Sequence, residues 1–278
     1  MSSQIDDVRA KLIEAIQTNR IVLPTLPEVA LRIRDAAEDP RTDVVSFAKE
    51  LGFDAAISAR VMRVANSPLM RGSTQVTDVK AATGRLGIQY SCNLAVGLAM
   101  EQMFQATSDA IDERMRQIWT HSTEVAGISA VLARTYTRLK PDQATLAGLV
   151  HKIGALPILR FAEEDRSLLK DLGMLDALID SLHGEIGKLI LDTWGFPPEI
   201  AAVPLAYLDF ARNPPAVDFA DIVMVANLQS YMGSSNALAS VDWNTVSAFG
   251  RIGLDPDVNS MEVEDLSEAM AASIAALQ

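Results

Sequence analysis

Apolar residues recur every three or four positions along most of the chain, and this spacing places them on one face of an α-helix. One short series comprises Ile57, Val61, Val64 and Ala65. A longer series between residues 111 and 136 predicts a helix of about six or seven turns. That series consists of Ile111, Met115, Ile118, Ser122, Val125, Ser129, Leu132 and Tyr136.

Two further series and two end signals extend this pattern. The first series is Ile186, Leu189, Ile190 and Trp194, and the second is Leu266, Met270, Ile274 and Leu277. The second predicts a C-terminal helix that packs on the body of the protein. Asp54 stands where a helix N-cap is expected, and Asn66-Ser67-Pro68 ends the same helix.

Strand signals are nearly absent, because no alternating apolar run is bounded by a hairpin turn. The breaks between helical segments are short, and no regular repeat or low-complexity stretch interrupts them. We therefore predict a compact all-α fold of roughly a dozen helices. If the fold divides into two helical lobes, the hinge is expected near residues 105–109.

Composition and charge restrict the kinds of partner. The 278 residues are 49% hydrophobic, and 24 Lys and Arg against 36 Asp and Glu give a net charge of −12. Such a charge argues against general nucleic-acid binding and against docking on an anionic membrane. Cys92 is the sole cysteine, so no internal disulfide forms, which fits a reducing compartment. The N-terminus lacks a signal-peptide pattern, and no uninterrupted apolar run approaches the ~20 residues of a membrane span. We predict a cytoplasmic protein.

Six short segments carry recognisable motifs in a fixed order. The third ends at Leu86-Gly87, the fifth contains His151-Lys152, and the sixth contains Trp194-Gly195-Phe196-Pro197. Together they cover about residues 19–215. The segments are Leu23–Glu28, Leu51–Pro68, Val76–Gly87, Trp119–Ser122, Ala147–Gly154 and His183–Pro197.

In this order, the six segments resemble the HDOD family of bacterial signalling proteins, the HD-related output domains. The resemblance implies an all-α fold related to the HD-type metal phosphohydrolases. It also implies a family that serves mainly as an output or scaffolding module and is usually regarded as non-catalytic. We accordingly expect an HDOD domain over residues 19–215 and a C-terminal helical extension over residues 216–278.

The resemblance also indicates where a metal site would lie. An HD phosphohydrolase holds its metal with a His, a His-Asp pair and a distant Asp. The matching positions here are His121, His151, Lys152 and Asn227, so both carboxylates are replaced. The second His pair found in many relatives would fall near Tyr207-Leu208 and is absent.

These replacements predict that the site holds no metal. The Lys152 ammonium repels a cation, and Asn227 supplies no negative charge. We expect the four positions to lie together in the core and Lys152 to reach solvent or pair with an acid, because an unpaired buried ammonium is costly. His183 is a possible neighbour of this pocket. Three histidines could form a zinc site, but buried, hydrogen-bonded histidines are the simpler interpretation.

A second candidate site is a basic patch formed by Arg60, Arg63, Asn66 and Arg71, which could bind an anion or a partner. A solvated helix face is the simpler interpretation of the same residues. No phosphate-binding glycine loop is present, and no cofactor is expected. Met100, Met103, Met115, Trp119, Trp194 and Trp243 are interpreted as core residues.

Three functions remain open on the sequence. The first is a non-catalytic scaffold acting through signalling proteins, for which the resemblance suggests sensor kinases, response regulators or cyclic-di-GMP enzymes. The second is a residual metal-dependent phosphohydrolase, supported by His121 and His151 and opposed by Lys152 and Asn227. The third is a nucleotide sensor without turnover, in which Lys152 and arginines would hold phosphate.

Overall fold

The computed structural model describes residues 2–18, 20–70, 72–164, 166–255 and 261–278, and these residues contain no strand. The all-α fold class predicted from the sequence is confirmed. Short 3-10 turns lie at Met100–Met103, Ala237–Ser240 and Trp243–Thr245. The helices are α1 Ser2–Gln17, α2 Glu28–Glu38, α3 Val44–Leu51, α4 Ala55–Asn66, α5 Val79–Leu86, α6 Ile88–Ala99, α7 Asp109–Tyr136, α8 Pro141–Val150, α9 Ala155–Glu164, α10 Arg166–Lys170, α11 Leu172–Thr193, α12 Pro198–Ala201, α13 Val203–Ala206, α14 Phe219–Ser230, α15 Ser247–Ile252 and α16 Met261–Leu277.

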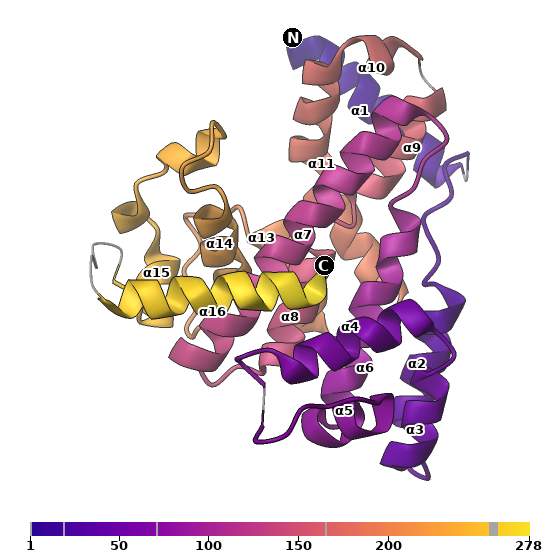
Figure 1. Ribbon diagram of the computed structural model, residues 1–278. Coiled ribbons are helices and arrows are strands. Elements are labelled where there is room, and N and C mark those ends of the chain that lie inside the picture. The colour runs from indigo at the N-terminus through magenta and orange to yellow at the C-terminus, as the bar shows by residue number, and fades with distance from the viewer. Residues whose placement is uncertain (1, 19, 71, 165, 256–260) are drawn as a thin grey trace.

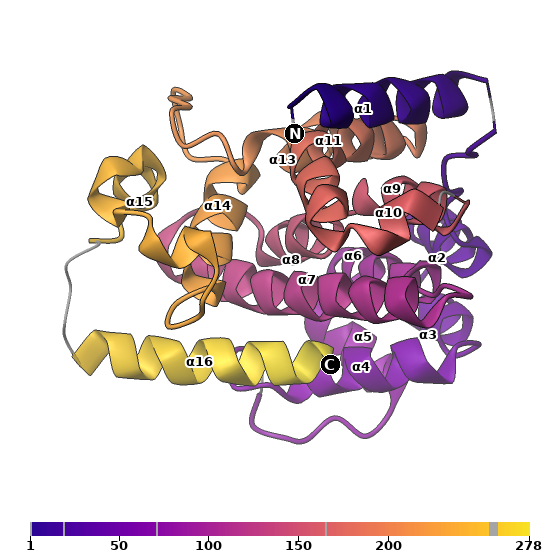
Figure 2. The ribbon, with the colours of Figure 1, turned by 90° about the horizontal axis from the view of Figure 1, so that it is seen from above.

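The long helix α7 is the central element of the fold. It contacts α8, α14 and α16, and Figures 1 and 2 show it crossing the middle of the molecule. Its apolar face is buried as the sequence predicted, with Ile111, Met115 and Leu132 fully inaccessible. Helix α8 approaches it closely at Gly148, where a Cβ atom would lie only 2.5 Å from the Cα atom of Ala126. This contact fixes the end of α8, and therefore His151, against α7.

Helix α4 begins and ends at the residues that the sequence pattern indicated, and so does the break between α5 and α6. The Asp54 carboxylate accepts a hydrogen bond from the Ile57 amide and caps α4. At the other end of α4, the Asn66 side chain donates to the carbonyl of Val76 and accepts from its amide, both at 2.8 Å. This pair of bonds closes the connection from α4 to α5. Gly87 separates α5 from α6.

The first and sixth motifs contact each other although they are far apart in sequence. The Trp194 indole N–H donates to the Pro24 carbonyl at 2.9 Å, and Arg34 donates to the Trp194 carbonyl at 2.7 Å. Trp194 is 7% exposed and packs against Phe196. These contacts hold the N-terminal segment on the C-terminal end of α11, so both motifs have a structural role.

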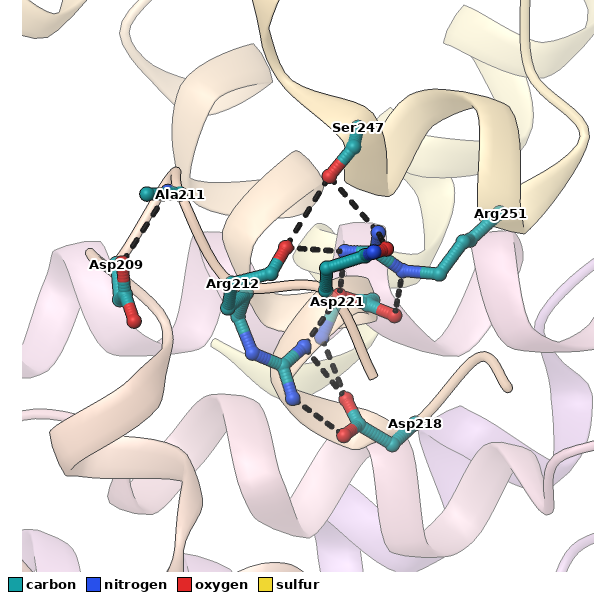
Figure 3. Close-up of polar contacts among 8 residues, drawn as sticks. Asp209, Ala211, Arg212, Asp218, Asp221, Ser247 and Arg251 are labelled. Carbon is teal, nitrogen blue, oxygen red and sulfur yellow. Dashed lines mark hydrogen bonds and ion pairs between the residues drawn. The ribbon is translucent and has the colours of Figure 1, made fainter. Parts of the chain in front are cut away.

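A buried ion network joins α14 to α15 (Figure 3). Asp221, in the first turn of α14, is fully buried and pairs with Arg212 and Arg251. Arg251 donates from Nε and Nη2 to the two carboxylate oxygens, each at 2.8 Å. Asp218 caps α14 and also binds Arg212. Because a buried charge is stable only when paired, the two arginines and the cap fix the orientation of α14.

The C-terminal helix α16 lies alongside α7 and also contacts α4 (Figure 2). Ser273 and Leu277 on its inner face are 7% and 2% exposed. Nearly all of the described buried apolar residues belong to one contiguous cluster from Leu12 to Leu277, so the described helices share a single core. The apolar face predicted for α11 is wrong at Leu189, because that side chain faces away from this core and is 48% exposed.

One described segment is apolar enough to cross a membrane by length and composition. Pro141–Glu164 reaches a mean hydropathy of 1.2, but 89% of that window is buried inside the fold. It comprises α8 and α9, which contact α7. Its apolar character therefore follows from its position in the core. Met100, Met103, Met115 and Trp119 are buried as predicted, and Trp243 stacks on Phe249.

Candidate functional site: the HD-like centre

The positions that match the HD metal ligands lie together at the meeting point of α7, α8 and α14. We call His121, His151, Lys152 and Asn227 the HD-like centre. His121 lies on α7, Asn227 on α14, and His151 and Lys152 follow the last residue of α8. The His121 and His151 rings have centroids 5.6 Å apart, and His121 Nε2 lies 2.9 Å from Asn227 Oδ1.

The hydrogen bonds define the protonation of the histidines. His151 Nδ1 lies 2.6 Å from the Gly148 carbonyl oxygen. Because a carbonyl oxygen only accepts, Nδ1 carries the proton and donates it, and Nε2 is left with a free lone pair. His121 donates from Nε2 to Asn227 Oδ1. Burial, and secondarily the charge of Lys152, lowers the pKa of His121 to about 3 and that of His151 well below its usual value. Both rings are therefore neutral near pH 7.

Lys152 meets the expectation of solvent contact or an acidic partner only in part. Its side chain is half-buried, and it forms no ion pair with a described carboxylate. Its Nζ atom donates to the Tyr231 hydroxyl at 3.2 Å and lies 5.8 Å from the centroid of the same ring. Burial lowers the pKa of Lys152 to about 8, and the negative charge of Asp180 only partly offsets this effect. The phenol of Tyr231 accepts the hydrogen bond that an acid was expected to accept.

Two tyrosines that sequence reasoning did not single out complete the site. Tyr231 stacks on His121 with ring centroids 4.7 Å apart. Tyr207, fully buried, packs edge-on against His151 at 4.9 Å. The only sequence signal for Tyr207 was its place where a second histidine pair would fall in relatives.

His183 lies in the middle of α11 and packs in the protein core. The N-cap of that helix is Asp171. His183 is 3% exposed. Its Nδ1 donates to the Ile179 carbonyl at 2.7 Å, and its Nε2 accepts from the Tyr207 hydroxyl at 2.8 Å. Burial lowers the pKa of His183 to about 4. With both ring nitrogens engaged, His183 offers no lone pair to a metal.

The donor set of the HD-like centre does not fit a divalent metal. His121 points an N–H at Asn227, and the Lys152 ammonium brings positive charge. His151 Nε2 and Asn227 Nδ2 are buried without partners, and an amide N–H cannot ligate a cation. Among the described residues, no group of three or more His, Cys, Asp and Glu side chains is placed to hold a metal.

The residues of the predicted basic patch are mostly engaged within the protein. Arg60 forms an ion pair with Glu101, and Asn66 holds the Val76 backbone. Arg63 is exposed on α4, and Arg71 lies outside the described residues. Arg60 and Asn66 are therefore occupied by contacts within the protein, and anion binding by the patch stays a prediction. Glu101 was not foreseen as a partner because it lies 41 positions away in sequence.

The HDOD domain family matches residues 23–207. That range exceeds half of the chain and includes His121, His151 and Lys152, although Asn227 lies beyond it. The chain belongs to the HDOD family. No curated protein matches the chain significantly.

Solved structures share the fold over nearly the whole chain. A protein of Shewanella amazonensis SB2B, described as a candidate metal-dependent phosphohydrolase, is 29% identical with a TM-score of 0.88, covering 99% of this chain and 100% of that one. An HDOD domain protein of Geobacter sulfurreducens is 21% identical with a TM-score of 0.67, and the match covers 98% of this chain and 97% of that one. A candidate signal transduction protein of Marinobacter aquaeolei VT8 is 21% identical with a TM-score of 0.65, and the match covers 99% of this chain and 65% of that one.

Proposed function

We propose that this protein is a non-catalytic output module of bacterial signal transduction that acts by binding other proteins. The observation that carries the proposal is the position of Lys152. Its ammonium lies beside His121 and Tyr231, at the sequence position of a metal-binding carboxylate. An HD phosphohydrolase needs a divalent metal to activate water and bind phosphate, and a cation at this position opposes metal binding.

Membership of the HDOD family and the Marinobacter relative, described as a candidate signal transduction protein, support a signalling role. The partners we propose are sensor kinases, response regulators or cyclic-di-GMP enzymes in the cytoplasm. Binding to nucleic acid or membranes is not proposed, because the net charge of −12 repels both.

The proposal is tested by elemental analysis and by a phosphatase assay with p-nitrophenyl phosphate, Mg²⁺, Mn²⁺ and Zn²⁺. We expect no stoichiometric metal and no turnover above that of a His121→Ala, His151→Ala control. Pairwise binding assays against candidate signalling proteins should give a partner whose binding survives the same two substitutions. A transition metal bound by His121 and His151, or metal-dependent turnover lost in the control, would overturn the proposal.

Restoring both carboxylates gives a complementary prediction. The double variant Lys152→Asp, Asn227→Asp removes the ammonium and supplies two anionic ligands beside His121 and His151. We expect it to bind Mn²⁺ or Zn²⁺ at least about tenfold more tightly than the unmodified chain, measured by calorimetric titration. Equal affinities would mean that charge at these positions does not control metal binding.

A residual phosphohydrolase is the second candidate, favoured by the likeness to the Shewanella protein described as a candidate metal-dependent phosphohydrolase. The metal and phosphatase measurements distinguish it from the scaffold. A nucleotide sensor without turnover is separated from both by calorimetric titration with cyclic dinucleotides and purine nucleotides.

A further inference from the structure

A groove of about 510 Å³ lies between α16 and the pair α7 and α14. Most of its lining is apolar. Ile128 of α7 forms part of it, and Met232, two residues after the end of α14, is 65% exposed at its side. Leu266, Met270 and Ile274 of α16 form a row along it. With a rise of 1.5 Å per residue this row is about 12 Å long, which matches two turns of a helix.

The polar part of the same groove presents hydrogen-bond acceptors. Gln229 Oε1 is buried without a partner, and the Ser230 hydroxyl already donates its proton to the Asn227 carbonyl. Glu124 has His121 Nδ1 at 4.0 Å, but that ring is neutral, and burial raises the pKa of Glu124 itself, so the carboxylate lacks a cationic partner that would stabilise its charge. No Lys or Arg lies among the described residues that line the groove.

These properties select the chemistry of an occupant. A negative carboxylate and unused acceptors complement a positively charged donor, and the apolar row complements an apolar helix face. Glu268, exposed on α16, adds to the negative charge of this helix. Methionine side chains adapt their shape to different partners, which suits Met232 and Met270 to such a contact.

We propose that this groove is the docking site for a basic amphipathic helix of a partner protein. The helix would place apolar residues at positions i, i+3 or i+4, and i+7 along the row of α16, and a Lys or Arg against Glu124 and Gln229. This inference rests on the proposed function, since it specifies where and how the scaffold binds a partner.

The decisive experiment is site-specific photocross-linking in cells of the source organism. Met232 is replaced by p-benzoylphenylalanine in the full chain, and Phe53, equally apolar and 66% exposed against 65%, is replaced as the matched control. We expect position 232 to cross-link a protein segment with the stated apolar spacing and at least one Lys or Arg, and position 53 not to capture that segment.

A synthetic peptide of the captured segment then measures affinity by fluorescence anisotropy. Met270→Gln should weaken binding at least about tenfold, because an apolar contact is lost without a change of charge. Glu124→Gln should weaken it several-fold and reduce its dependence on salt. Phe53→Gln should bind like the unmodified chain.

Other results overturn the docking inference. One is the absence of any cross-link at position 232. Another is a cross-link from position 232 to a second copy of this chain, to a phospholipid or to a segment without basic residues. The third is equal capture of the segment from position 53. If a signalling protein binds while position 232 captures nothing, the docking site is wrong and the proposed function stands. Metal-dependent turnover would instead overturn the proposed function.

Discussion

Lys152 shows how one residue changes the chemistry of the HD-like centre. The half-buried ammonium lies beside neutral imidazoles and a phenol without an ion pair to a described carboxylate, which costs free energy unless hydrogen bonds compensate. Tyr231 accepts one hydrogen bond from it at 3.2 Å, and its ring lies under the charge. The positive charge of Lys152 also helps to keep His121 and His151 neutral. The centre therefore holds one cationic side chain next to two neutral imidazoles, and burial disfavours that charge.

The first prediction concerns the three histidines. We expect ¹⁵N NMR at pH 6 to show His151 and His183 protonated at Nδ1 and His121 at Nε2, with no ring titrating near pH 6.5. The folded pKa values of His121 and His183, about 3 and 4, lie below the value of about 6.5 for an unfolded chain.

The unfolded state therefore binds more protons below pH 6.5, and the stability due to neutral histidines is lost as the pH falls from 6.5 towards 3. Urea denaturation should show a fall of at least about 3 kcal/mol between pH 6.5 and 4. A ring that titrates near its ordinary pKa would contradict this prediction.

The second prediction concerns the free-energy cost of Lys152. The folded pKa of about 8 lies below its usual value of 10.5, so the cost is fully present below pH 8 and disappears as the pH rises through 10.5. Lys152→Met should raise the free energy of unfolding at pH 7 by about 2 kcal/mol, after the loss of the Tyr231 hydrogen bond is included.

The difference between Lys152→Met and the unmodified chain should shrink between pH 8 and 10.5 in denaturant titrations. Lys49→Met, on an exposed position of α3, is the control and should change stability by less than about 0.5 kcal/mol. A destabilised Lys152→Met variant would show that the Tyr231 contact outweighs the cost of burial.

At the scale of elements, the glycines of the fifth motif determine how closely helices approach. Gly148 lets α8 approach α7, and Gly154 lets the chain pass α11. A Cβ atom on Gly154 would lie 2.0 Å from the His183 carbonyl oxygen and 2.4 Å from the Gly187 amide nitrogen. Both contacts are with backbone, which cannot rotate away as a side chain can.

The third prediction is therefore that Gly154→Ala destabilises the protein by at least about 3 kcal/mol. Gly84→Ala, on α5, is the matched control because no atom lies within 4 Å of its added Cβ. It should be neutral or slightly stabilising, since alanine is the better helix former. Urea denaturation compares the two variants, and equal midpoints would mean that α9 and α11 can separate without cost.

Across the whole molecule, local signals in the sequence predicted the helices and tertiary contacts determined the rest. The Asp54 cap, the break at Gly87 and the length of α7 follow from short-range patterns. The placement of Tyr231 and the pairing of Arg60 with Glu101 depend on contacts between distant segments, which no local pattern encodes. The motif positions indicated which residues to compare with an HD site, but not how Lys152 is accommodated.

The last prediction concerns the C-terminal helix. Helix α16 packs on α7 and α4, and Leu277, 2% exposed, is buried near its end. Deleting residues 257–278 should uncover apolar surface on both helices and lower the melting temperature by roughly 10 °C or more. Leu277→Ser should act in the same direction by about 2 kcal/mol, whereas Ala275→Ser, exposed on the same helix, should stay within about 0.5 kcal/mol. If the shortened chain melts at the temperature of the full chain, α16 contributes nothing to the core, and the helix that forms one wall of the groove would be held there only by a partner.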